Sequence, residues 1–407
     1  MLSVAEARAR VLAAMSPVGQ ETVSLAACWN RVAARPVLAR RLQPPTDQSA
    51  MDGYALRAAD GAAGTQLRVV GSAPAGHPWA GTLGPGETLR IFTGSVMPDG
   101  SDTVLLQEDA VEESGGETIR PSCVATLAGR HVRRAGQDFA PGDVLVPAGR
   151  RFSARDVGLA ASGDNPWVSV HRRPVVAILA TGDEIALPGE PVPPGGIVSS
   201  NSHALAALVR AGGGEPVVLP IAADQEAAIV DAVRGLRADL LVTTGGASVG
   251  AHDLVRPALA RLGLALDFWK VAMRPGKPLM LGQLRAEAGE LPLLGLPGNP
   301  VSGLIVALLF LWPALQRLGG ASESGLLPVE NATLGRDLPA NDHREDYLRA
   351  ALEETEQGPL VTPLARQDSG QMRALAMAGA LVIRPPHAPH AAQGDRLPII
   401  RLARFGL

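Results

Sequence analysis

Residues 239 to 253 read DLLVTTGGASVGAHD, in which a short apolar run gives way to two threonines and a pair of glycines. The run at 240–242 is too short and too apolar to alternate, as in a parallel strand covered on both faces. Glycines at 245 and 246 permit positive φ and leave N–H groups open to an anion. The stretch predicts a buried strand opening into an anion-holding loop, although an ordinary glycine-rich turn explains it equally well. Its spacing matches neither a dinucleotide-binding nor a Walker motif.

The segments around this loop alternate between strand and helix patterns. VVAILATGDE and PVVLPIAADQ are typical of strands that end in polar loops, whereas NSHALAALVRAGG and DQEAAIVDAVRGL have helical spacing. This order is typical of a parallel sheet with helices on its faces. Residues 171–320 are therefore predicted to form a doubly wound α/β domain.

A chain of 407 residues exceeds what one hydrophobic core organises, so further domains are expected. Helical spacing at the start of the chain and again at 151–163 predicts a discontinuous helical domain from residues 1–40 and 140–170. Short apolar runs between Gly, Pro and Asp predict a β-rich domain at 41–139. Residues 325–407 lack long helices and read as a small C-terminal β domain.

Composition and charge narrow the class of protein. A formal charge of −3 and only 3% aromatic residues do not indicate a nucleic-acid-binding surface, which needs clustered basic residues and aromatic side chains. Cys28 and Cys123 have no C-x-x-C spacing, which argues against a thiolate metal site or a disulfide-dependent fold and favours a cytoplasmic protein. The N-terminal residues lack a leader pattern, and Ser3 with Glu6 forms a capping box. The run at 304–312 ends at Pro313 and is too short to cross a bilayer, so a core helix and no membrane partner are expected.

Two more predicted strands end as the first one does. ATGDE follows one apolar run, and GLPGNPVS follows another just before a helix. In open α/β sheets, ligands bind at the carboxyl ends of the strands where the strand order reverses. Three polar glycine loops at that edge would share one crevice, which makes three unrelated turns the weaker interpretation.

Acidic residues gather at those strand ends. They are Asp183, Glu184, Asp224 and Asp253. Together such carboxylates can hold a divalent cation, and Mg²⁺ bridging to phosphate is the usual arrangement. Asp183 and Glu184 are adjacent, so in an extended segment only one would face a given ligand. Helix capping remains the competing interpretation for Asp224 and Asp253.

The stretch WKVAMRPGKPLM carries Lys270, Arg274 and Lys277 beside a glycine and two prolines. Such a stiff segment can present cationic side chains to an anion at low entropic cost. The alternative is a polar loop with solvated cations. No histidine pair has the i, i+4 spacing of a metal site.

Three polar turns lie in the β-rich segment: PPTDQSAMDGYA, RIFTGSVMP and RRAGQDFAPGD. Each one alone is explained as a structural turn. The first contains Asp52, which in a dimer could supply a carboxylate to the crevice of a neighbouring subunit.

Taken together, these motifs resemble one known family. PPTDQSAMDGYA, IFTGSVMP, RRAGQDF, ATGDE, SNSHAL, TTGGASVGAHD, MRPGKP and GLPGNPVS occur in the order and spacing of the molybdopterin molybdenumtransferase (MoeA) family, which is related to the E domain of gephyrin. The resemblance covers essentially the whole chain. It implies a homodimer whose subunits have a discontinuous helical domain, a β-rich domain, a molybdopterin-binding α/β domain and a C-terminal β-barrel.

The resemblance also implies a reaction. Adenylylated molybdopterin would bind in the crevice, molybdate would be delivered to the dithiolene, and the pyrophosphate bond would be hydrolysed with Mg²⁺ present to release AMP. Molybdopterin adenylyltransferase and factors that deliver the cofactor to molybdoenzymes would be partners. Such hydrolysis needs neutralised charge and correct positioning more than a protein nucleophile.

The resemblance assigns roles to residues of this chain. The carboxylates that would hold Mg²⁺ and the phosphates are Glu184, Asp224 and Asp253. The partner subunit would offer Asp52, with Thr93 and Asp138 nearby. The remaining positions would bind the pterin-side phosphate, shape the wall or neutralise phosphate and molybdate: Gly245, Gly246, Ser248, Pro297, Pro300, Arg274, Lys277, Arg349 and Ser369. Arg274 stands where many members carry lysine, so its charge is kept but its donor geometry is not.

Two other functions stay open within this resemblance. One is adenylylation of molybdopterin, which the additional domains disfavour. The other is a binding or scaffold protein, because the gephyrin relative anchors receptors through this fold. The retained acidic and basic residues argue against a scaffold that has lost catalysis.

Overall fold

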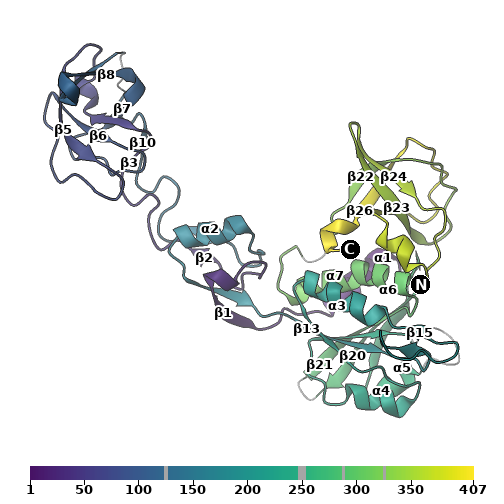
Figure 1. Ribbon diagram of the computed structural model, residues 1–407. Helices are drawn as coiled ribbons and strands as arrows, with labels where there is room; N and C mark the ends of the chain where they lie inside the picture. The colour runs from purple at the N-terminus through teal and green to yellow at the C-terminus, as the bar shows by residue number, and fades with distance from the viewer. Residues whose placement is uncertain (123–126, 246–253, 287–288, 324–326) are drawn as a thin grey trace.

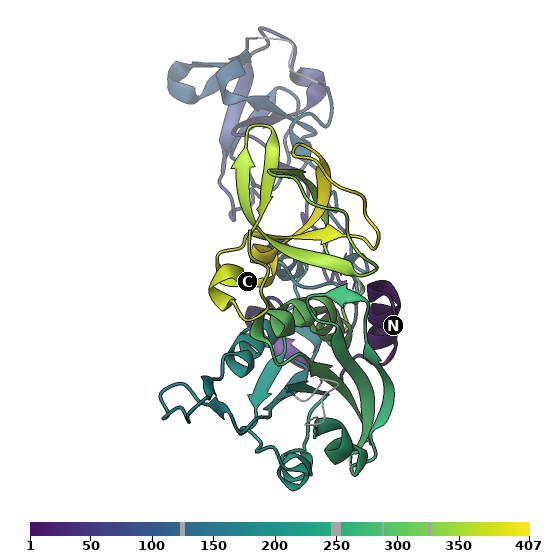
Figure 2. The same ribbon diagram turned by 90° about the vertical axis from the view of Figure 1, so that its right-hand side faces the viewer.

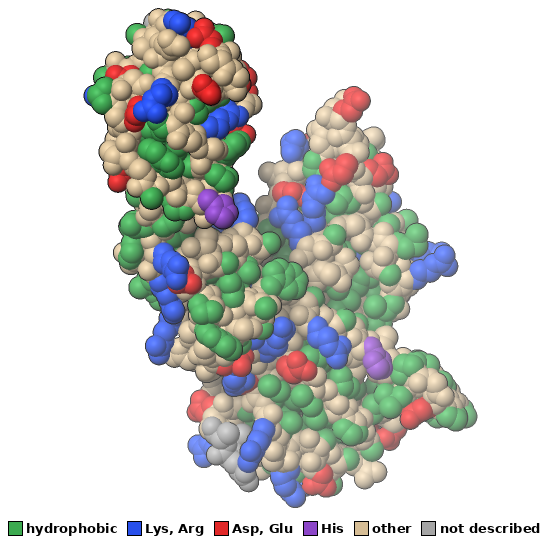
Figure 3. Space-filling view, turned by 60° about the vertical axis from the view of Figure 1, so that its left-hand side comes forward, with side chains coloured by type: hydrophobic (Ala, Val, Ile, Leu, Met, Phe, Trp, Pro, Cys, Tyr) green, Lys and Arg blue, Asp and Glu red, His purple; other side chains and the backbone are tan. Residues whose placement is uncertain are grey.

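The computed structural model describes residues 1–122, 127–245, 254–286, 289–323 and 327–407, and it is elongated (Figure 1). A β-rich lobe (residues 44–138) forms one end. An α/β domain and a C-terminal barrel form the other end, and a connecting domain (residues 20–43 and 139–171) lies between them. The chain thus crosses the connecting domain twice, on its way to the lobe and back. Figure 3 shows an open gap between the lobe and the barrel.

The α/β domain is built on one six-stranded sheet. In spatial order its strands are β16 (Glu215–Val218), β13 (Val175–Ala180), β17 (Leu240–Thr244), β21 (Gly289–Leu296), β20 (Pro278–Ala286) and β18 (Ala265–Lys270). The first four strands are parallel to one another. Strand β20 pairs antiparallel with both β21 and the edge strand β18. Because β16 lies outside β13 while β17 lies inside it, the strand order reverses between β13 and β17. A ligand crevice is expected at the carboxyl ends of these two strands.

Both faces of the central strands β13, β17 and β21 are buried, as their apolar residues predict. Along β13, Val176 and Ile178 pack into one core and Ala177 and Leu179 into another. The first core contains α3 (Asn201–Ala211), and the second contains α4 (Glu226–Val233) and α5 (Val255–Ala260). The predicted doubly wound architecture is confirmed.

The long apolar helix of the first core does not end at Pro313. It runs through α6 (Pro300–Val306), a π-helical stretch (Ala307–Leu311) and α7 (Trp312–Leu318), so the predicted stop is wrong. Pro313 lies in the first turn of α7, where a missing N–H is tolerated, and the π-helical stretch before it changes the hydrogen-bond register. Pro300–Leu318 is long and apolar enough to span a membrane, but 83% of it is buried inside the protein. It is placed as a core helix.

The N-terminal helix α1 (Val4–Ala13) packs on the α/β domain instead of joining α2. Its buried residues Val4, Ala7 and Val11 belong to the first core of that domain. The predicted capping box is present, with the Glu6 N–H donating to Ser3 Oγ at 3.2 Å. Figure 2 shows the helix beside the strands of the α/β domain. The spacing identified the helix, but the partner of its apolar stripe is set by tertiary packing.

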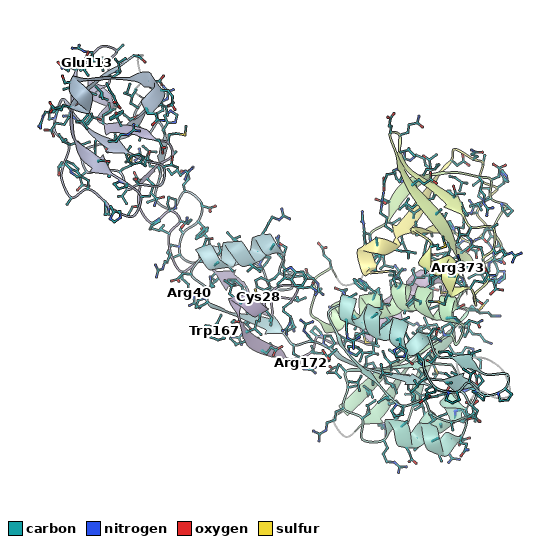
Figure 4. The ribbon with its side chains drawn as sticks, viewed as in Figure 1. Cys28, Arg40, Glu113, Trp167, Arg172 and Arg373 are labelled. Carbon is teal, nitrogen blue, oxygen red and sulfur yellow. The ribbon has the colours of Figure 1, made fainter. Side chains whose placement is uncertain are left out.

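The connecting domain is consequently smaller and less helical than expected. Its elements are β1 (Gln20–Ser24) paired with β12 (Trp167–His171), β2 (Val37–Leu38) paired with β11 (Val144–Val146), and α2 (Ala154–Ser162). Cys28 lies in its core, where burial raises the pKa of the thiol. Figure 4 places Cys28 inside this domain and Arg172 at its junction with the α/β domain.

The two remaining domains are β structures. The lobe contains a six-stranded sheet, in spatial order β7 (Thr103–Leu106), β4 (Gly53–Leu56), β6 (Glu87–Ile91), β5 (Leu67–Ala73), β9 (Thr118–Pro121) and β8 (Ala110–Glu113). The C-terminal strands are β22 (Glu330–Leu334), β23 (Glu345–Thr355), β24 (Gly358–Pro363), β25 (Ala380–Arg384) and β26 (Arg396–Arg401). Pairing of β23 with β25 closes these five strands into a barrel, and the short β19 (Met273–Arg274) adds to the edge of β23.

Candidate functional site

Three polar loops of the α/β domain meet at Gly245, directly after β17. Gly245 has a φ of +91°, and a Cβ at this position would lie 2.9 Å from the carbonyl oxygen of Thr181 in the ATGDE loop. A Cβ on Gly298, in the GLPGNP loop, would lie 3.4 Å from the Cα of Gly245. The close approach of Gly245 to Thr181 depends on glycine, which has no side chain to separate the backbones, and Gly298 lies within van der Waals distance of Gly245. The structure brings the three loops to the edge of the sheet where the strand order reverses.

Two acidic residues of this edge have different surroundings. The Glu184 carboxylate is exposed and lies beside Gly182, because a Cβ built on Gly182 would be 2.6 Å from Glu184 Oε2. Asp183 Oδ1 instead accepts the N–H of Asp224 at 2.9 Å and so joins the loops after β13 and β16. Of these two neighbours, Glu184 is the one whose carboxylate accepts no hydrogen bond within the described residues and stays available to a ligand.

Asp224 does not cap α4. The N-cap of this helix is Gln225, which makes no side-chain capping bond, so the capping interpretation of Asp224 is wrong. The carboxylate of Asp224 is exposed on the same loop that Asp183 holds. Asp253, Gly246 and Ser248 lie outside the described residues.

The donor set of this edge suits a hard divalent cation. Exposed carboxylates are the ligands that Mg²⁺ takes from proteins, and it commonly uses one or two of them together with waters and substrate phosphates. Over the described ranges there is no group of three His, Cys, Asp or Glu side chains that could hold a metal without a substrate. Glu184 and Asp224 therefore fit a cation shared with a phosphorylated ligand.

The two basic residues of MRPGKP are placed differently. Arg274 Nε donates to Asp346 Oδ1 at 2.9 Å, and Asp346, on β23 of the barrel, is 4% exposed. Arg274 Nη1 is also 3.5 Å from Asp342 Oδ2. The hydrogen bond to Asp346 raises the pKa of Arg274. Lys277 is exposed, and in the described part of the chain no ion pair of its ammonium is found, so Lys277 is the cation left for an anionic ligand.

The barrel reaches the GLPGNP loop through Ser369. Asn299 Nδ2 donates to Ser369 Oγ at 3.0 Å, and the Val301 N–H donates to the Ser369 carbonyl at 3.1 Å. Pro297 is buried in that loop and Pro300 is the first residue of α6. The predicted positions Pro297, Pro300 and Ser369 therefore lie together at the boundary between the α/β domain and the barrel.

Arg349 supports this boundary from inside the barrel. It is 1% exposed, and its Nη1 donates to the Asp368 carbonyl at 2.8 Å while its Nε donates to Gln367 Oε1 at 3.2 Å. Burial lowers the pKa of the guanidinium. Its contacts hold residues 367–368, directly before Ser369, and do not present the side chain to solvent.

A second cluster forms in the β-rich lobe, at the end nearest the connecting domain (Figure 1). The Thr93 N–H and Oγ1 both donate to Asp52 Oδ1, at 2.7 and 2.8 Å. The bond from the Thr93 backbone is the main reason that the pKa of Asp52 is lowered. Short strands β3 (Gln48–Ser49) and β10 (Val132–Arg133) pair beside it, which brings the turn containing Asp138 to the same end. The three polar turns of the lobe thus converge.

The lobe cluster and the crevice lie in different domains of one subunit (Figure 1). The connecting domain separates them, and the lobe is held away from both the barrel and the α/β domain (Figures 1 and 3). One copy of the chain therefore does not bring Asp52, Thr93 and Asp138 to Glu184 and Gly245.

Comparison with known proteins identifies the family. Three family models match in succession: MoeA N-terminal region (domain I and II) over residues 2–163, Probable molybdopterin binding domain over 177–317, and MoeA C-terminal region (domain IV) over 331–402. The chain belongs to the MoeA family. As a member, it is a molybdenumtransferase of molybdenum cofactor biosynthesis.

Full-length relatives agree with this assignment. A molybdopterin molybdenumtransferase of a Nostoc species is 36% identical over 94% of this chain and 88% of its own length. The Haemophilus influenzae protein of the same name is 30% identical over 98% of both chains. A crystal structure of the molybdopterin biosynthesis MoeA protein from Pyrococcus horikoshii has 28% identity and a TM-score of 0.80, over 98% of this chain and 99% of its own. The predicted family, fold class and enzyme class are confirmed.

Proposed function

We propose that this enzyme inserts molybdenum from molybdate into adenylylated molybdopterin and releases AMP. The family assignment supports molybdenum transfer, and the crevice supports the phosphorylated substrate. Gly245 has no side chain at the end of β17, the neighbouring loops carry the exposed residues Glu184 and Asp224, and Lys277 is an exposed cation. Such a set neutralises and orients phosphate groups, which is most of what hydrolysis of a phosphoanhydride requires.

The position of each residue suggests its role in binding the substrate or the metal. Main-chain N–H groups after β17 bind a phosphate on the pterin side, as glycine loops at strand ends do. Lys277 offsets charge on the phosphates or on molybdate, and Ser369 lines the barrel side. Mg²⁺, when bound, would be held by Glu184 and Asp224 together with the phosphates, and Asp253 is proposed as a further ligand. The Mg²⁺ ion would supply charge neutralisation at the pyrophosphate bond that breaks.

The proposal rests most directly on the separation of the two polar clusters. Thr93 holds Asp52 through two hydrogen bonds, and the turn containing Asp138 lies at the same end of the lobe, yet their own subunit keeps these residues away from its crevice. An antiparallel homodimer would place the Asp52 cluster of one subunit at the crevice of the other. We infer that the working site is shared, with Asp52 contributed in trans and Glu184 in cis.

An assay with adenylylated molybdopterin tests the reaction. AMP release that requires both Mg²⁺ and molybdate, matched by molybdenum in the product, is expected. ATP consumption with free molybdopterin would support adenylylation instead, and the absence of either activity in folded dimers would support a scaffold. In the cytoplasm, an adenylyltransferase would supply this substrate, and delivery factors for molybdoenzymes would receive the product.

A further inference from the structure

Asn201, the first residue of α3, bridges two of the three crevice loops. Its Nδ2 donates to Thr244 Oγ1 at 2.7 Å and to the carbonyl oxygen of Gly298 at 2.7 Å. Thr244 is the last residue of β17, directly before Gly245, and Gly298 is the glycine that faces Gly245 in the GLPGNP loop. One amide group thus spans the loop junction at its closest point.

The chemistry of these partners fixes the orientation of the amide. A carbonyl oxygen only accepts, so the Asn201 atom 2.7 Å from the Gly298 oxygen must be the nitrogen. Both of its N–H groups are then used. Thr244 is 2% exposed, so its hydroxyl depends on protein partners, and the neighbouring Thr243 Oγ1 is buried with no partner in the described part of the chain. The end of β17 has no evident replacement for Asn201.

The same loop is held from the opposite side by the barrel. Ser369 binds Asn299 and the Val301 N–H, whereas Asn201 binds Gly298. We propose that Asn201 is a positioning residue of the active site, which sets the spacing between the phosphate-binding end of β17 and the GLPGNP wall. It acts through these loops and does not itself contact the substrate. The kinetic part of this inference rests on the proposed function.

Asn201→Ala and Asn201→Asp test the bridge that Asn201 makes between Thr244 and Gly298. His203→Ala is the matched control, because His203 is exposed two residues along the same helix. Asn201→Asp keeps the size but places an acceptor against the Gly298 carbonyl. In dimeric full-length enzyme, both variants are expected to raise KM for adenylylated molybdopterin about tenfold while kcat changes less than about twofold. Thr244→Val should match them, and Thr244→Ser, which keeps the hydroxyl, should restore the wild-type KM.

Hydrogen exchange separates this inference from the proposed reaction. In Asn201→Ala, amide exchange in residues 297–301 should rise at least about tenfold, whereas the melting temperature and exchange in the lobe stay as in His203→Ala. This readout holds even if the wild-type enzyme releases no AMP. Unchanged exchange at 297–301, or a lower melting temperature and kcat with an unchanged KM, would overturn the positioning role.

Discussion

The guanidinium of Arg274 is bound to the carboxylate of Asp346 across the boundary between the α/β domain and the barrel. Nε donates to Oδ1 at 2.9 Å, and Nη2 donates to Oδ2. Such a two-point contact uses the planar fork that lysine lacks. Arg274, which the sequence predicted to bind the substrate, is therefore bound to Asp346 instead, and Lys277 remains available to an anionic ligand.

Substitution of Arg274 should lower stability, whereas substitution of Lys277 should lower activity. Arg274→Ala leaves the buried Asp346 without its partner, so we expect a loss of about 1–3 kcal/mol in the free energy of unfolding. The value is at the low end for a buried pair because the Arg274 side chain is 47% exposed. Lys277→Ala should leave stability unchanged but lower AMP release at least about 100-fold. Denaturant unfolding and the AMP assay measure both, and the reverse pattern would refute this division of roles.

The carboxylates of the crevice should be needed for reaction and not for folding. Glu184→Ala and Asp253→Ala are expected to abolish AMP release while the melting temperature stays within a few degrees of wild type. Glu190→Ala provides a control, because Glu190 is exposed on the same segment and its carboxylate accepts the Leu187 N–H. Wild-type turnover in both crevice variants would refute the site.

The hydroxyl of Thr93 should add to the effect of the Thr93 backbone N–H in lowering the pKa of Asp52. Thr93 lowers the pKa of Asp52 from its ordinary value of 3.8, so any stabilisation from the charged carboxylate is present above pH 3.8 and lost as the pH falls through the lowered pKa. Thr93→Val keeps the backbone N–H but removes the side-chain donor, and the pKa should rise toward 3.8. An NMR titration of the Asp52 carboxyl group measures it. Thr93→Ser should retain the low pKa, and an unchanged pKa in Thr93→Val would contradict the assigned cause.

Arg349 should stabilise the barrel edge that carries Ser369. Arg349→Ala removes a side chain that is 1% exposed together with its hydrogen bonds to the Asp368 carbonyl and Gln367 Oε1, so about 3 kcal/mol of local stability is expected to be lost. Hydrogen exchange in residues 345–355 and 367–371 measures the loss. Arg373→Ala, at an exposed position of α8 (Met372–Ala376), should be neutral. Full stability with lost AMP release would show instead that the guanidinium contacts substrate.

Local patterns predicted the α/β domain and its glycine loops, because a buried parallel strand and a positive-φ glycine each impose a composition on the sequence. Gly245 and the apolar core of β13 are examples. The capping box at Ser3 likewise needs only neighbours in the chain. These features are short-range, so the spacing of residues carries them.

Contacts between segments far apart in the sequence could not be predicted from the spacing of residues. The packing of α1 on α7 depends on which apolar face is nearest, and the helix through Pro313 depends on a π-helical stretch. The roles of Asn201 and Asp346 appear only when segments separated by 43 and 72 residues meet. In the sequence, a polar residue at a helix start or within a strand gives no sign of such a partner.

A mixed dimer tests the shared site most directly. One subunit carries Asp52→Ala and the other carries Glu184→Ala, each with a different affinity tag so that only heterodimers are assayed. If Asp52 acts in trans, one of the two sites keeps both carboxylates, and AMP release should be about half that of the wild-type dimer while either variant homodimer is inactive. If both residues serve the crevice of their own subunit, every site has one defect. No AMP release above the homodimers would then contradict the shared site.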